Sequence, residues 1–155
     1  MDSNIVEISI DKTKELLEKL GIAYSDVMGS YDAVDNSVSL QIKGDDIGIL
    51  IGFHGKNLDS MKVVLSIMIN KDLGRDNSVR IYLDINDYSA KRTEQLKSML
   101  ENAKSIMETR QKSVYTFPPM SPADRRTIHT LAAEMGIKTE SMGEGKDRHV
   151  NLIRE

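Results

Sequence analysis

Two glycines three residues apart are the first feature of this sequence that could do chemistry. They belong to the segment Ile51-Gly52-Phe53-His54-Gly55. Glycine lets the backbone turn sharply and leaves its amides uncovered, so a phosphate backbone can approach within hydrogen-bonding distance. A helix that follows such a turn would also present its positive N-terminal end to the phosphate. Taken alone, the pattern equally fits an ordinary turn between two helices.

The residues around the turn favour a nucleic-acid site. Ile51 and Leu58, with the exposed edge of a strand, would line an apolar groove for bases that are read on their edges. The two central residues are Phe53 and His54, and Lys56 is the nearest fixed positive charge. We therefore expect the turn to read shape and bases more than to clamp phosphate. The candidate RNA-binding residues here are Ile51, Gly52, Phe53, His54, Gly55, Lys56 and Leu58.

An arginine and a histidine four residues apart, Arg125 and His129, form a second candidate site. In a helix they lie on one face, one turn apart. A guanidinium and an imidazole at the rim of a groove can hold phosphate and stack on bases. The alternative is a surface arginine beside a histidine that is satisfied by a backbone carbonyl.

The glycine turn must be positioned by elements in the first half of the chain. Leu16, Leu17 and Leu20 fall on one side of a short helix, and apolar and polar residues alternate over 37–43 as in a half-buried strand. The predicted elements are a helix over 11–20, strands over 23–31 and 37–43, helices over 45–51 and 56–72, and a strand over 78–84. The order is therefore α-β-β-α-α-β.

The second site requires a helix, whose start is predicted at Ser121-Pro122-Ala123-Asp124. Serine is a favoured N-cap, proline a favoured first residue, and an acid suits the first turn. The other predicted elements are a long helix over 88–111, a β-like stretch over 114–117, and strands near 137–141 and 148–153, joined by a turn at Gly143-Glu144-Gly145. We expect two α/β units that meet near residues 85–88, which gives domains over 1–86 and 87–155.

Together these motifs resemble the bacterial Jag family, also called the KhpB or EloR type. The first half resembles a KH domain of type II, and the region from Phe117 to Val150 resembles the R-three-H domain, named for its Arg-x-x-x-His pair. The resemblance implies an α+β fold, with a type II KH-like α-β-β-α-α-β unit followed by a small α/β R-three-H unit. It also implies the nucleic-acid-binding residues Arg125, Arg126, His129 and Arg148.

The resemblance implies a single-stranded RNA-binding protein of the post-transcriptional regulator or RNA chaperone type, linked in Jag-like proteins to cell-envelope or division control. Single-stranded DNA is a further expected ligand, and a small stand-alone KH protein is an expected partner. Most Jag-type proteins carry an N-terminal Jag-N domain that this sequence lacks, so we do not expect functions that depend on it. The alternative is a protein–protein adaptor that uses both folds as scaffolds.

Composition argues against several other classes. The 155 residues include no cysteine, which excludes disulfides and thiol catalysis and fits a reducing compartment. The three histidines show no recognised metal spacing, and no catalytic pairing is visible. We therefore expect no enzyme, no cofactor and no metal. No apolar run approaches the roughly 18 residues of a membrane span, so we expect a cytoplasmic protein.

Charge is distributed unevenly along the chain, whose net charge is -3. Residues 1–86 carry 9 basic and 14 acidic side chains, whereas residues 87–155 carry 12 and 10. The second part is therefore the expected electrostatic anchor for an anion.

Overall fold

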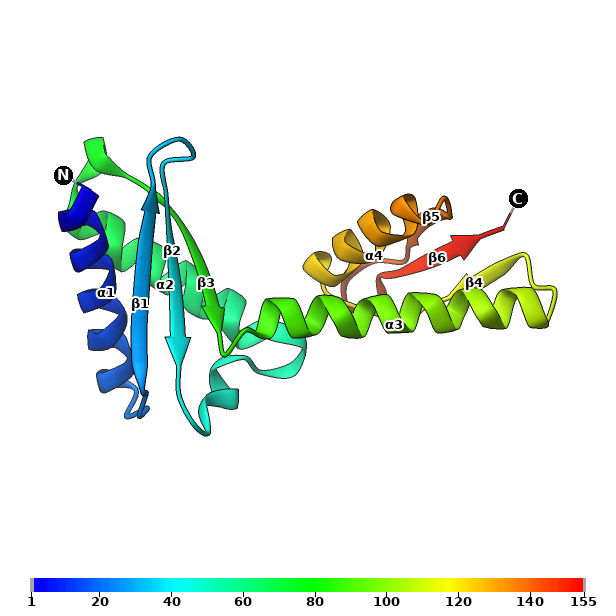
Figure 1. Cartoon of the computed structure of the whole chain (residues 1–155), viewed down its shortest axis with the longest axis horizontal. Helices are drawn as coiled ribbons and strands as arrows, with labels where there is room; N and C mark the ends of the chain where they lie inside the picture. Colours follow the sequence, from blue (N-terminus) through cyan, green and yellow to red (C-terminus); the bar gives the residue numbers. More distant parts are fainter. Residues whose placement is uncertain (1, 155) are drawn as a thin grey trace. The chain divides into compact units, whose positions relative to one another are not determined.

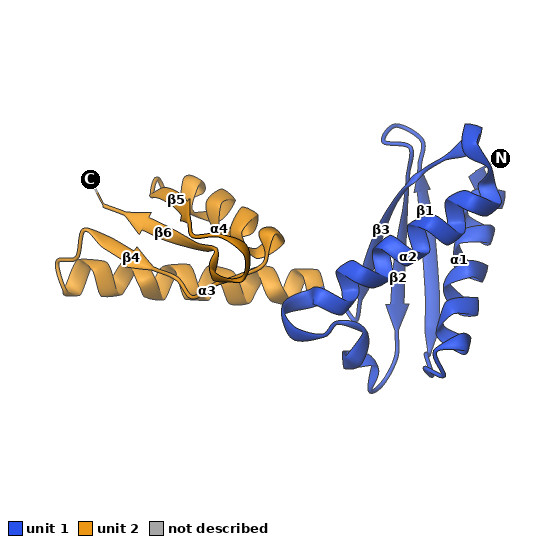
Figure 2. Cartoon of the chain, turned by 180° about the vertical axis from the view of Figure 1, so that it is seen from behind, with its two compact units in different colours: residues 1–88 blue, residues 89–155 orange. Residues whose placement is uncertain are grey.

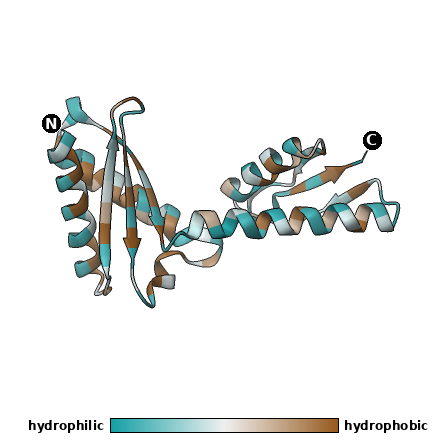
Figure 3. Cartoon of the chain, in the orientation of Figure 1, coloured by the Kyte–Doolittle hydropathy of each residue, from teal (hydrophilic) through white to brown (hydrophobic). Residues whose placement is uncertain are grey.

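The computed structural model describes residues 2–154. The chain divides into two compact units, Met1–Tyr88 and Ser89–Glu155 (Figure 2). Each unit has its own hydrophobic core, and bands of hydrophobic and hydrophilic residues alternate along its helices (Figure 3). The predicted α+β fold is confirmed. None of the helices in the described part of the chain is long and apolar enough to cross a membrane.

Unit 1 is a three-stranded sheet packed against two helices (Figure 1). Its elements are α1 (Asp2–Lys19), β1 (Asp26–Asp32), β2 (Ser37–Lys43), α2 (Lys56–Leu73) and β3 (Arg80–Ile85), with 3-10 turns at Ile47–Leu50, Phe53–Gly55 and Arg75–Asn77. The sheet order is β1-β2-β3, where β1 and β2 are antiparallel and β2 and β3 are parallel. The predicted α-β-β-α-α-β order is confirmed, except that the helix expected over 45–51 is a single 3-10 turn.

Helix α1 begins at Asp2, so the predicted start at residue 11 is wrong. The buried line along this helix contains two hydroxyls, Ser9 and Thr13. Each hydroxyl donates a hydrogen bond to a backbone carbonyl one turn earlier, at 2.7 Å for Ser9 and 2.8 Å for Thr13, so neither is buried without a partner. Polar residues on the buried face concealed the helical period. Leu20, expected on the buried side, lies beyond the helix and is exposed.

A network of charged side chains joins α1 to α2. Lys12 Nζ lies 2.8 Å from a carboxylate oxygen of Glu15 and 2.9 Å from one of Asp72, while Lys19 Nζ lies 2.7 Å from the other oxygen of Glu15. The hydrogen bonds from Lys12 and Lys19 lower the pKa of Glu15 from 4.5 to about 2. The hydrogen bonds to Glu15 and Asp72 raise the pKa of Lys12. Asp72 therefore helps to hold α1 on α2 while it is ionised, and Glu15 holds Lys12 and Lys19 within α1.

We expect Glu15→Gln to flatten the acid dependence of stability. A carboxylate whose pKa is lower in the folded state stabilises the fold above its unfolded pKa, and loses that effect as pH falls. For Glu15 the loss falls between pH 4.5 and about 2. Urea unfolding followed by circular dichroism across this range measures it, with Glu18→Gln, an exposed acid on the same helix, as the matched control. An equal slope in the parent and in Glu15→Gln would contradict the prediction.

Unit 2 is a second three-stranded sheet with two helices. Its elements are α3 (Tyr88–Thr109), β4 (Val114–Thr116), α4 (Pro122–Glu134), β5 (Lys138–Met142) and β6 (His149–Ile153), with a 3-10 turn at Gly145–Asp147. The sheet order is β4-β6-β5, and both pairings are antiparallel. The predicted start of α4 is confirmed, because Ser121 Oγ accepts a hydrogen bond from the backbone N–H of Asp124 at 3.1 Å.

Candidate nucleic-acid interface

The glycine turn adopts a conformation that requires glycine at both ends. Gly52 and Gly55 have φ of 68° and 81°, in the left-handed region. A Cβ on Gly52 would lie 2.6 Å from the side chain of Asn57, which donates a hydrogen bond to the carbonyl of Ile49 at 2.7 Å. A Cβ on Gly55 would lie 3.2 Å from the ring of Tyr88. Asn57 and Tyr88 therefore support the turn, although the sequence pattern did not identify them.

The first amides of α2 are already used by the chain itself. The backbone N–H groups of Asn57 and Leu58 donate to the carbonyl of Ile51 at 3.0 and 3.2 Å. The backbone N–H of Lys56 donates to the carbonyl of Phe53. The preceding turn therefore satisfies these donors, and a phosphate at this helix end would meet only its partial positive charge.

The backbone N–H groups of the turn that make no hydrogen bond within the described chain lie at its tip. Among the hydrogen bonds of residues 2–154, none is donated by the backbone N–H of Phe53 or His54. Phe53 is 73% exposed, and its ring stacks on that of His54 with the centroids 3.9 Å apart. A stacked ring pair next to two amides can hold a base on the rings and a phosphate on the amides.

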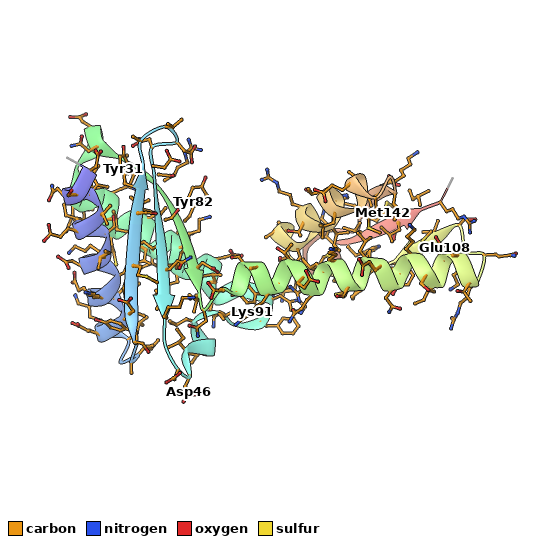
Figure 4. All side chains as sticks on the ribbon, in the orientation of Figure 1. Tyr31, Asp46, Tyr82, Lys91, Glu108 and Met142 are labelled. Carbon is orange, nitrogen blue, oxygen red and sulfur yellow. The ribbon has the colours of Figure 1, made fainter. Side chains whose placement is uncertain are left out.

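A groove runs between α2, the helix that follows the turn, and β3. It has a volume of about 390 Å³ and is lined by Asp59, Lys62, Val63, Ser66, Ile67 and Ile81. Val63 and Ile67 are 59% and 65% exposed, so they offer apolar surface to a ligand. Lys62 Nζ lies 5.6 Å from the centroid of the Tyr82 ring, on the neighbouring strand β3 (Figure 4). A cation and an aromatic ring therefore border the apolar surface.

The apolar residues of this groove differ from those predicted. Leu58 is 8% exposed and lies in the core, and Ile51 packs against that core, so the expected groove role of Leu58 is wrong. Its place is taken by Val63 and Ile67. The sequence holds a signal for them, because residues 56–73 carry more apolar side chains than one buried helix face accommodates.

In unit 2, His129 uses both ring nitrogens within the protein. Nδ1 lies 2.7 Å from the hydroxyl of Thr139, and Nε2 lies 2.8 Å from the hydroxyl of Ser141. These contacts tie α4 to β5. The histidine is therefore satisfied, as in the alternative interpretation of this motif, although by two hydroxyls in place of a carbonyl. Contact between His129 and phosphate would require one of these bonds to break, and in this structure the ring connects α4 to β5.

Three arginines lie at one end of unit 2. Arg125 and Arg126 belong to the first turns of α4, and the backbone N–H of Met120, just before that helix, donates to the carbonyl of Arg148 at 3.2 Å. Arg125 is half-buried, while Arg126 and Arg148 are exposed. None of the three takes part in an ion pair within the described part of the chain. Their guanidinium groups are therefore available to an anion.

A buried ion pair holds this end of α4 against α3. Arg92 Nη2 and Nε lie 2.8 and 3.3 Å from the two carboxylate oxygens of Asp124. The side chains are 15% and 6% exposed. The backbone N–H of Asp124 also donates to Ser121, so the same residue joins the helix cap to α3. The sequence placed Asp124 at the helix start but did not reveal its partner, which lies 32 residues away.

Family comparisons agree with this architecture. The model of the KhpA/KhpB KH domain matches residues 10–83, and the model of the R-three-H domain matches residues 94–154. The chain is thus a protein in which a KH unit precedes an R-three-H unit. It is 34% identical over 151 residues to RNA-binding protein KhpB of Clostridium symbiosum, an alignment that covers 94% of this chain and 67% of that protein. The chain belongs to the KhpB family, which confirms the resemblance seen in the sequence.

Two other relatives align with a smaller part of this chain. RNA-binding protein KhpB of Bacillus subtilis (strain 168) is 33% identical over 118 residues, which is 74% of this chain and 55% of that protein. DNA-binding protein SMUBP-2 of Rattus norvegicus is 39% identical over 64 residues, which is 41% of this chain and 6% of that protein. The chain therefore spans between about half and two thirds of the length of these two KhpB proteins.

Proposed function

We propose that this protein binds single-stranded RNA and acts without catalysis, as a cytoplasmic regulator or chaperone of RNA. The observation that carries the proposal is the tip of the glycine turn. There Phe53 and His54 combine a stacked, exposed ring pair with two unused backbone N–H groups, and the helix that follows them lines an apolar groove. The relatives named RNA-binding protein KhpB support the same activity.

The KH unit, which we assign to residues 1–86, would bind about four nucleotides. The amides of Phe53 and His54, with Lys56 beside them, would meet a phosphate, and bases would lie along Val63 and Ile67. Stacking on an aromatic side chain contributes about 1–3 kcal/mol per base. Since this part of the chain is acidic overall, the bases supply more of the affinity than the phosphates do.

The R-three-H unit, which we assign to residues 87–155, would supply the electrostatic contact. Arg125, Arg126 and Arg148 would bind phosphates, and His129 would hold α4 at the correct angle on β5. Two weak sites on one chain strengthen each other, because binding at the first raises the effective concentration at the second.

We expect Arg125→Ala to reduce the salt dependence of RNA binding. Loss of one phosphate contact lowers the slope of log K against log salt by about 0.7 for a single strand. The affinity itself should fall about tenfold, as expected for one hydrogen-bonded charge. Fluorescence anisotropy with a mixed-sequence RNA over a potassium chloride series measures both. Lys97→Ala, which removes an exposed cation of α3, is the control; an equal slope in both variants and the parent would refute the assignment.

A protein-interaction role is the second candidate, favoured by an apolar stripe on α2. Val63, Val64 and Ile67 are all exposed there. The class of partner is a small stand-alone KH protein, in keeping with a family model that covers both KhpA and KhpB. Light scattering of this chain mixed with a small stand-alone KH protein tests the candidate. The variant Val64→Lys should weaken the complex, because it changes the stripe at a residue that does not line the groove. No complex with the parent chain would remove this candidate.

A further inference from the structure

Unit 2 contains a second cleft, at the opposite end from its three arginines. It has a volume of about 370 Å³, within the usual range of roughly 300–1,000 Å³ for small-ligand sites. Its walls come from the last turns of α3, from the turn at Gly136 that follows α4, and from the ends of β5 and β6. Helix α4 has 13 residues, so about 20 Å separates its two ends.

Positive charge gathers around this cleft. Lys104, Lys138 and Arg154 line it, and none of them makes an ion pair or a side-chain hydrogen bond with any other described residue. Glu108, labelled near the C-terminal end of α3 in Figure 4, is the acid among the lining residues. Among the lining residues, three cations outnumber one exposed carboxylate, so the lining carries a net positive charge, which attracts an anion.

The rest of the cleft is apolar. Met107, from the core of the unit, and the half-buried Ile137 and Ile153 line it beneath the charged side chains. A simple ion such as phosphate would use the cations and leave this apolar surface wet. A ligand that combines a negative charge with a flat apolar body uses both kinds of surface, and a nucleotide has that composition.

We propose that this cleft binds one nucleotide, with its phosphate on Lys138, Arg154 and Lys104 and its base on the apolar lining. We base this on the proposed RNA binding: the nucleotide would belong to the same strand that Arg125 holds. At a rise of about 3.4 Å per stacked nucleotide, the roughly 20 Å along α4 corresponds to about six nucleotides. A free nucleoside monophosphate presents the same chemistry and is the other source of ligand.

The variant Lys138→Ala/Arg154→Ala tests whether the bound nucleotide belongs to an RNA strand. Both side chains are exposed, so their removal leaves the core intact. We expect about tenfold weaker binding of a 12-nucleotide RNA and a salt slope lower by about 0.7, which is the loss of one phosphate contact. A 4-nucleotide RNA cannot reach from one end of α4 to the other, and its affinity should be unchanged. Arg75→Ala/Lys97→Ala removes two exposed cations elsewhere and is the charge-matched control.

Nuclear magnetic resonance with adenosine 5′-monophosphate tests binding of the free nucleotide to the 155-residue chain. Amide signals of Gly136, Ile137 and Ile153 should shift in the parent and stay fixed in Lys138→Ala/Arg154→Ala. Either positive result supports the cleft and identifies its source. If the parent binds RNA, but the cleft variant equals the control and the nucleotide shifts none of these signals, the cleft proposal is overturned alone. If the parent binds no RNA, the proposed function fails, and the nucleotide titration then decides the cleft.

Discussion

Replacing Phe53 and His54 together by aspartate should weaken the binding of single-stranded RNA about 100-fold. The two carboxylates would stand where a phosphate approaches the free amides of the turn. Two unit charges at 4 Å interact by about 1 kcal/mol in water and about 4 kcal/mol near a protein surface. We therefore expect a loss of about 3 kcal/mol in the free energy of RNA binding, which corresponds to an affinity about 100-fold lower.

The fold should tolerate this change. Phe53 is exposed, and His54 has a φ of 52°, a conformation that aspartate adopts more readily than most residues. Substitution of Gly52 is a poorer test, because its new Cβ would meet Asn57 and distort the turn itself. Fluorescence anisotropy gives the affinity, and circular dichroism confirms the fold.

Asparagine at the same two positions is the matched control, since it has the shape of aspartate without the charge. The asparagine pair should lose the stacking contribution, about 1–3 kcal/mol, and the aspartate pair should lose more, by an amount that shrinks at high salt. Equal affinities in the two variants would show that no phosphate lies at the tip of the turn. Unchanged affinity in both would remove the turn from the RNA site.

Asp124→Asn should destabilise unit 2 by about 3 kcal/mol. The substitution removes the negative charge of Asp124 from beside the guanidinium of Arg92, whose side chain is 15% exposed. Breaking one side of a buried pair costs about 3–5 kcal/mol, and the lower end applies because Arg92 keeps some contact with water. Amide hydrogen exchange, resolved on peptides from residues 89–155, measures the change in the unit that carries it.

Two further variants serve as a control and as a test of the cause of this loss of stability. Asp147→Asn, an exposed acid in the same unit, should have little effect. The double variant Arg92→Met/Asp124→Leu removes both charges and should recover most of the lost stability, because replacing both members of a buried ion pair by apolar side chains costs less than removing one of them. If the double variant is as unstable as Asp124→Asn, the loss does not arise from the positive charge of Arg92.

The sequence by itself determined the order of elements and the place of the two motifs. The alternation over 37–43, the cap at Ser121 and the glycines at 52 and 55 are local signals, since each depends on residues only a few positions apart. Where polar residues shared a buried face, as in residues 2–10 of α1, the local period was concealed and the predicted boundary was wrong.

The tertiary structure alone decided which groups remain free to bind a ligand. The pattern Gly-x-x-Gly indicated exposed amides. Only the fold showed that the carbonyl of Ile51 accepts hydrogen bonds from the first amides of α2, whereas the amides of Phe53 and His54 donate none to any described residue. The sequence predicted the same nucleic-acid-binding role for Arg125 and His129. In the structure, however, both ring nitrogens of His129 are hydrogen-bonded to residues of β5, while Arg125 makes no ion pair among the described residues. A hydrogen-bond partner can lie anywhere along the chain, so its identity depends on how distant elements pack and not on local spacing.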